Sequence, residues 1–180
     1  MYKTRRMMAA ALAAIAIFAA LGCSPDALGE WVPAGMKKIS TDAVEYDLYI
    51  PSEWEEDYSA GVVTAYVSSA DRSSISVIAF DLDDPYQTVE EYWNDNKGAF
   101  TSFFTDMEFE VEGEATLLGG VTASKFVYTA NASGEPYKFM QVICLRDGSV
   151  YIFTYTARAE RYDRHLENVQ KILENFSFKS

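Results

Sequence analysis

The sequence predicts an α+β domain in which an antiparallel sheet carries helices on both of its faces. Three observations predict this class. Short apolar runs with strand periodicity follow one another, and turn residues of the hairpin type connect several of them. Two longer segments have apolar residues at helical spacing. Residues 136–146 and 149–156 are apolar on both parities, as expected of strands in the middle of three layers.

The first strands come before residue 83. Apolar residues alternate from 44 to 50, which predicts a strand, and Pro51 is expected to end it. Residues 62–68 and 75–82 are predicted as two further strands, separated by a polar turn. The acidic residues around Trp54 favour a charged surface loop.

A helix follows these strands. Thr88 and Glu91 have the spacing of a capping box, in which the hydroxyl accepts from a free amide and the carboxylate reaches back. The helix is expected to run from 89 to about 104. Its apolar face comprises Val89, Tyr92, Trp93, Asn96, Phe100 and Phe103.

Four strands and a second helix complete the domain. The predicted strands span 107–118, 121–131, 136–146 and 149–156, the helix 159–174, and a short last strand 176–179. The first of these strands alternates apolar residues with Glu108, Glu110, Glu112 and Glu114, so one face is solvated and an edge position is expected. The glutamates are too far apart along a strand to share an ion, and we interpret them as a solvated face.

The N-terminal segment predicts an export signal. Residues 1–6 are basic, and the uncharged apolar run 7–21 is too short to span a bilayer, so residues 1–22 are predicted as a signal peptide. Gly22 before Cys23 resembles the lipobox of bacterial lipoproteins, although Ala20 and Leu21 depart from the common residue order. The resemblance implies cleavage before Cys23 and a diacylglyceryl group on its sulfur. The alternative is ordinary secretory cleavage, with Cys23 incidental.

A tether and a single domain are expected after the signal. Residues 23–35, rich in Pro and Gly, are predicted as the lipidated Cys and a linker, and 36–180 as the domain. Removing residues 1–22, which carry three basic residues and no acid, changes the formal charge from −12 to −15. Anionic lipids repel such a body, so the lipid has to hold it at the membrane.

Composition excludes several classes of protein. The chain is 49% hydrophobic, so it can bury a core and is not intrinsically disordered. Its 27 acidic against 15 basic residues exclude a general nucleic-acid binder, which needs cations to replace phosphate counterions. One His and two Cys argue against a His-based metal site and a disulfide scaffold.

The order of elements resembles the PsbP family of extrinsic photosystem proteins and their bacterial relatives. The resemblance covers Tyr46–Lys179. It lies in the runs Tyr49–Trp54, Tyr151–Ala157 and Ile172–Phe178, with the pair Tyr162-Asp163 between the last two. It implies an α-β-α sandwich, and many small bacterial members are lipoproteins without an assigned activity. The plant members retain calcium and chloride at a manganese cluster, but their residues for this have no match here.

Three aspartates are the candidate metal ligands. Asp81, Asp83 and Asp84 lie at the end of a predicted strand, where turn carbonyls can add to the six to eight oxygens that calcium takes. A strand-ending turn is the alternative interpretation. No other cofactor is predicted.

No catalytic residue is assigned. His165 is expected at the flank of the last helix, because no partner for a general base is recognisable in the sequence. Cys144 is expected in the core rather than as a reactive thiolate.

These observations predict a lipid-anchored extracytoplasmic bacterial domain. We expect it to be non-enzymatic and to bind or position an envelope protein or a small ligand, held to the membrane through Cys23. Two alternatives stay open at this point: a surface-tethered hydrolase with an unrecognised active site, and a calcium-dependent binding protein.

Overall fold

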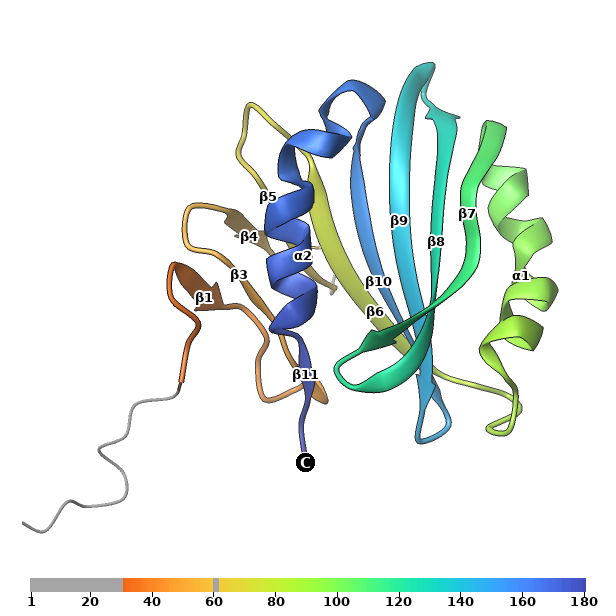
Figure 1. Ribbon diagram of the computed structural model, residues 1–180, viewed down its shortest axis with the longest axis horizontal. Coiled ribbons are helices and arrows are strands. Elements are labelled where there is room, and N and C mark those ends of the chain that lie inside the picture. Colours follow the sequence, from red (N-terminus) through yellow and green to blue (C-terminus); the bar gives the residue numbers. More distant parts are fainter. Residues whose placement is uncertain (1–30, 60–61) are drawn as a thin grey trace, which may run out of the picture. The chain divides into compact units, whose positions relative to one another are not determined.

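A seven-stranded antiparallel sheet dominates the computed structural model, which describes residues 31–59 and 62–180 (Figure 1). The spatial order of the strands is β4-β5-β6-β10-β9-β8-β7. Their bounds are β4 Glu55–Asp57, β5 Val63–Tyr66, β6 Ser74–Asp81, β7 Thr105–Leu118, β8 Val121–Ala132, β9 Glu135–Arg146 and β10 Ser149–Arg158. Strand β10 therefore returns to lie beside β6, although four elements separate the two in the chain.

The positions of the long strands confirm the expectations from their patterns. β9 and β10, apolar on both parities, occupy the middle of the sheet, and β7, with its row of glutamates, is an edge strand. Asp147 and Gly148 connect β9 to β10 with φ of 52° and 80°, as the tightest hairpin turns require.

The helix α1 (Val89–Phe103) begins as predicted at a capping box. The Glu91 amide donates to Thr88 Oγ1 at 3.2 Å, and the Thr88 amide donates to Glu91 Oε2 at 2.8 Å. Trp93 stacks on Phe126 of β8 with 4.0 Å between ring centroids. Both rings belong to a hydrophobic cluster between α1 and the sheet, whose buried residues are Tyr92, Trp93, Phe126, Ile143, Val150 and Ile152.

The predicted helix 159–174 consists of two parts. Ala159–His165 is a 3₁₀ helix, and the α-helix α2 begins only at Leu166 and ends at Glu174. The hydroxyl of Tyr155 donates to the carbonyl oxygen of Tyr162 at 2.8 Å. This side-chain hydrogen bond occupies a carbonyl oxygen that would accept a backbone amide in a continuous α-helix. The buried residues Val169 and Ile172 of α2 belong to the largest core cluster, with Val142 and Phe153 of the sheet.

Residues 44–50 do not form the single strand that their periodicity predicted. They contribute to two small sheets: β2 (Tyr46–Asp47) pairs with β11 (Ser177–Phe178), and β3 (Tyr49–Pro51) pairs with β1 (Met36–Lys38). Between them the Leu48 amide donates to Ser40 Oγ, and Leu48, Tyr49 and Ile50 are all buried, so the predicted alternation ends where the pairing partner changes.

One expectation about this region is confirmed and another was wrong. Pro51 ends β3 as predicted; it pairs with Met36 as the last residue of a two-stranded sheet, where a missing N–H is tolerated. Residues 55–57 form the edge strand β4 rather than a loop, since the neighbouring Trp54 is buried and holds this segment beside β5. Within the described residues, no helix has the length and hydropathy needed to cross a membrane.

Candidate functional site

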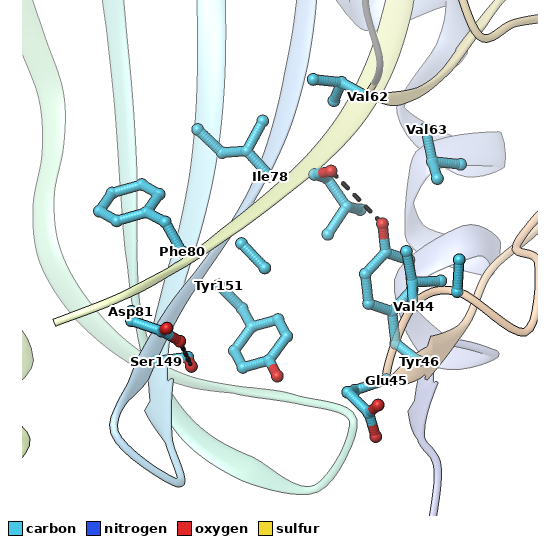
Figure 2. A pocket seen from close by; sticks show the side chains of 13 residues that line it. Val44, Glu45, Tyr46, Val62, Val63, Ile78, Phe80, Asp81, Ser149 and Tyr151 are labelled. Carbon is cyan, nitrogen blue, oxygen red and sulfur yellow. Dashed lines mark hydrogen bonds between the residues drawn. The ribbon is translucent and has the colours of Figure 1, made fainter.

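A cavity of about 350 Å³ lies beside the second half of β6 (Figure 2). Its apolar wall includes Val44 and Tyr46, which precede or begin β2, together with Val63 of β5 and Tyr151 of β10. Elements from four separate parts of the chain therefore form this hollow.

The cavity follows from a difference in length between two paired strands. The pairing of β5 with β6 ends at Val63 and Val77, whereas β6 continues to Asp81 with β10 on its other side. Among residues 31–59 and 62–180, no strand pairs with residues 78–81 on the side where β5 lies. Two large apolar side chains of this edge are unusually exposed, Ile78 at 37% and Phe80 at 45%.

Polar groups of the cavity are held in defined positions. The Tyr46 hydroxyl donates to the carbonyl oxygen of Val77 at 3.4 Å, and the Ser149 hydroxyl donates to Asp81 Oδ1 at 2.9 Å (Figure 2). Burial, together with the charge of Tyr151, raises the pKa of Tyr46 to about 12. Tyr46 is thus a neutral donor at physiological pH, and Glu45 and Asp81 supply the negative charge of the cavity.

The three candidate calcium ligands line one hollow together. Asp81, Asp83 and Asp84 border a hollow of about 480 Å³ next to Tyr92 of α1, and Asp81 also lines the cavity beside β6. The Asp84 carboxylate accepts from the Tyr86 amide at 2.9 Å, a typical contact of an Asp turn. Across the described residues, no three His, Cys, Asp or Glu side chains are grouped to hold a metal. The calcium assignment stays a prediction.

Of the two cysteines, only Cys144 lies among the described residues. Cys23, the predicted lipidation site, lies outside the described residues, as do the predicted signal peptide 1–22 and most of the linker. Cys144 is fully buried in β9, and its burial raises the pKa of the thiol to about 12, although Arg146 partly opposes this. The structure thus places Cys144 in the core, as its apolar neighbours predicted.

His165 has a partner that the sequence did not reveal. Its Nε2 lies 3.1 Å from Asp71 Oδ2, and the Ser73 hydroxyl donates to Asp71 Oδ1 at 2.7 Å. The carboxylate lies between the imidazole and the hydroxyl, so His165 does not contact the serine oxygen that a general base would have to deprotonate. This group joins the β5–β6 turn to the 3₁₀ helix.

A larger hollow, of about 540 Å³, lies between α2 and the β7–β8 turn. Met140 and Val142 of β9 line it, together with Leu173 of α2. Thr116 and Leu117 of the edge strand β7 also line it, so this hollow, like the cavity at β6, has apolar walls next to the end of a sheet.

Sequence reasoning did not identify Ile78 and Phe80 as site residues. The run 75–82 was correctly predicted as a strand, and the acidic residues after it mark its end. Which residues of that strand border the cavity depends on where its pairing with β5 stops and on β10 returning from far along the chain. No local pattern carries that information.

The fold defines the class of protein: an α+β domain with a mostly antiparallel sheet and two α-helices. The chain belongs to the PsbP-like protein family, whose model matches residues 40–178. This confirms the family resemblance of the domain. No protein with a curated description matches the chain significantly.

Solved structures with the same fold are distant in sequence. Cyanobacterial PsbP (CyanoP) from Synechocystis is 16% identical with a TM-score of 0.58, over 84% of this chain and 98% of that one. LpqN of Mycobacterium tuberculosis, described as involved in cell envelope biogenesis, is 15% identical with a TM-score of 0.56, over 81% and 91%. The Ran-binding protein Mog1p of Saccharomyces cerevisiae is 10% identical with a TM-score of 0.54, over 79% and 95%.

Proposed function

We propose that this protein is a bacterial lipoprotein whose PsbP-like domain binds a partner at the cell envelope. The observation that carries the proposal is the cavity beside β6, with the exposed Ile78 and Phe80 at its rim. Large apolar side chains exposed next to a cavity are typical of interaction sites.

The N-terminal sequence supports the location of this function. The basic start, the apolar run and the Gly22-Cys23 junction favour lipid attachment at Cys23, outside the cytoplasm. Two acyl chains on one residue give a stable anchor. The envelope role that LpqN's description states is compatible with this location.

The proposal includes the finer architecture predicted from the sequence. Val142 and Ile143 are neighbours in β9, so their side chains point to opposite faces of the sheet. Val142 packs in the cluster of α2 and Ile143 in the cluster of α1. We therefore propose that the two helices flank opposite faces, as in an α-β-α sandwich.

Site-specific photocrosslinking in native membranes tests the binding function. A photoreactive residue at Phe80 is expected to crosslink to a discrete partner. The same residue at Leu117, which is 62% exposed and lines the hollow of about 540 Å³ instead, is the comparison position and shows whether the partner binds at that second hollow. Equal crosslinking at both positions, or none at Phe80, would contradict the proposal.

The anchor is tested separately. Mass spectrometry of the wild-type protein is expected to show a diacylglyceryl-modified Cys23 at the N-terminus, and the Cys23→Ala variant is expected to lose the lipid and leave the membrane fraction. Wild-type protein that is unlipidated and released like the variant would refute the anchor.

A further inference from the structure

We propose that the α1 side of the sheet binds an uncharged polysaccharide chain through a grid of hydroxyl groups on β5, β6 and β10. The inference goes beyond the proposed partner-binding function and rests only on the extracytoplasmic location given there. The hydroxyl grid is defined as the six residues Thr64, Tyr66, Ser74, Ser76, Thr154 and Thr156.

The pairing of β5, β6 and β10, which lie side by side in the sheet, places the hydroxyl grid on one face (Figure 1). Directly opposed residues form two rows, the first of Thr64, Ser76 and Thr154 and the second of Tyr66, Ser74 and Thr156. Ile152, two residues before Thr154 in β10, packs in the cluster of α1, so the grid is on the α1 side. Its positions are about 4.8 Å apart between strands and about 6.6 Å apart along each strand.

The hydroxyl grid differs from an ordinary solvated sheet face. All six of its residues are partly exposed. The alternate residues of the same strands point into the largest core cluster and are buried: Val63, Ala65, Ile75, Val77, Phe153 and Tyr155. A solvated face usually carries charged side chains, as the glutamates of β7 illustrate, but none of the six grid positions does. Solvation alone therefore does not account for a face made of hydroxyls.

Few of the grid hydroxyls are used within the domain. The Thr64 hydroxyl donates to the Val62 carbonyl and the Thr154 hydroxyl accepts from Gln141 Nε2, both at 3.5 Å, the upper limit for a hydrogen bond. Among residues 31–59 and 62–180, no hydrogen bond involves the side-chain hydroxyls of Ser74, Ser76 and Thr156. Each of these hydroxyls can donate one hydrogen bond and accept others, so the grid can pair with a ligand that does both.

A buried amide at the border of the grid lacks a partner. Gln141 of β9 lies opposite Thr154 and is only 6% exposed. Its Nε2 is directed toward Thr154 Oγ1, but in the described part of the chain its Oε1 has no hydrogen-bond partner, although it is shielded from solvent. An unsatisfied buried acceptor costs free energy, and a donor that a ligand brings beside Thr154 would remove that cost.

Charge and polarity decide which class of ligand fits the hydroxyl grid. Glu55 and Asp57 of β4 continue its two rows beyond β5, and these carboxylates repel polyanions such as nucleic acids and anionic lipid surfaces. Protein interfaces are poor in Ser, and their hot spots are poor in Ser and Thr, so the grid does not suit a protein partner. An uncharged polysaccharide presents closely spaced hydroxyls that both donate and accept. It therefore matches a grid of hydroxyls with two carboxylate acceptors beside it.

Isothermal titration calorimetry of the full chain with uncharged oligosaccharides tests the proposal. The probes are cellohexaose, maltohexaose and chitohexaose, and saturable binding of at least one of them is expected. Thr154→Val and Ser76→Ala each remove one hydroxyl and are expected to weaken binding about threefold to tenfold, the usual effect of one hydrogen bond. Thr129→Val is the matched control, because Thr129 pairs with Lys138, two residues before Met140 of the other face, and is expected to leave binding unchanged.

Two further measurements locate the site and identify the ligand class. In the wild-type protein, the NMR signals of the Ser76 and Thr154 amides are expected to shift on addition of the bound oligosaccharide, while that of Thr129 stays in place. This readout needs no variant to fold. Inorganic polyphosphate is expected not to bind, and binding of the uncharged oligosaccharide is expected to change little with added salt, because no charge on the ligand is screened.

The contrary outcomes are distinct from one another. Absence of binding by all three oligosaccharides, equal binding by Thr154→Val and Ser76→Ala, or NMR shifts confined to Thr129 and its neighbours would refute the hydroxyl grid as the site. Binding of polyphosphate that weakens with salt would overturn the assignment to an uncharged ligand. Crosslinking at Phe80 in membranes without oligosaccharide binding would leave the partner-binding function in place and refute this inference alone.

Discussion

Replacing Asp71 with alanine is expected to destabilise the domain by about 2–3 kcal/mol. The carboxylate accepts from the Ser73 amide at 3.1 Å and the Ser73 hydroxyl at 2.7 Å, contacts His165 Nε2 at 3.1 Å, and lies 3.4 Å from Arg161. An ionised carboxylate only accepts, so His165 is the donor in this contact. The side chains of Asp71 and His165 are only 19% and 15% exposed. Hydrogen bonds to charged groups contribute about 1.5–3 kcal/mol, and truncation also leaves the buried Ser73 hydroxyl without its acceptor.

Urea unfolding followed by tryptophan fluorescence measures this effect, since Trp54 lies edge-on to His165 with 6.1 Å between ring centroids. Asp163→Ala removes the same charge from an exposed position of the same 3₁₀ helix and is expected to cost less than about 0.5 kcal/mol. A loss of that small size for Asp71→Ala would refute the reasoning and reduce the contact to a surface ion pair.

The pH dependence gives a second check on Asp71. Burial raises the pKa of its carboxyl, but the hydrogen bonds from Ser73 and the contact with His165 outweigh burial and hold the pKa well below its ordinary range. A carboxylate with a depressed native pKa stabilises the fold above its unfolded pKa of about 3.9 and loses that contribution as the pH falls toward the native value. The contribution of the Asp71 carboxylate to the stability difference between wild type and Asp71→Ala therefore shrinks as the pH falls below about 4. A difference that grows on acidification would contradict the assignment.

Three further predictions concern the core. Trp93→Ala removes the ring that stacks on Phe126 and is expected to cost about 3–5 kcal/mol in urea unfolding, and a loss below about 1 kcal/mol would contradict the packing. Gly119→Ala is expected to lower the free energy of unfolding by about 1–3 kcal/mol, because the φ of Gly119 is +56° and a Cβ there would lie 2.9 Å from Phe178. Gly98→Ala is the control: its helical position has open space around it, and the substitution is expected to raise the free energy of unfolding by about 0.5–1 kcal/mol. In a Cys23→Ala background, iodoacetamide at pH 8 is expected to leave Cys144 unmodified until urea unfolds the domain. The reason is that burial raises the pKa of the Cys144 thiol to about 12, so little reactive thiolate is present. Rapid labelling of the native protein would refute the burial of Cys144.

Local patterns predicted most of the long elements of the fold. The capping box of α1, the hairpin turn at Asp147-Gly148 and the double apolar parity of β9 and β10 each depend on neighbouring residues. The errors lie where distant segments decide the outcome. Residues 44–50 have strand periodicity, but their partners are Met36–Lys38 and Ser177–Phe178, which no local rule identifies.

The sequence by itself determined the fold class, the family resemblance and the predicted address, because hydrophobic periodicity, turn chemistry and the basic-apolar-Cys order are properties of adjacent residues. Tertiary structure alone decided the site. Strand β10 returns beside β6, the pairing of β5 with β6 stops at Val63, and a cavity lies beside the rest of β6. Asp71 and His165 meet across 94 residues of chain in the same way. Pairings of this kind are selected by the packing of the whole sheet, so their consequences cannot be found in any local stretch of the chain.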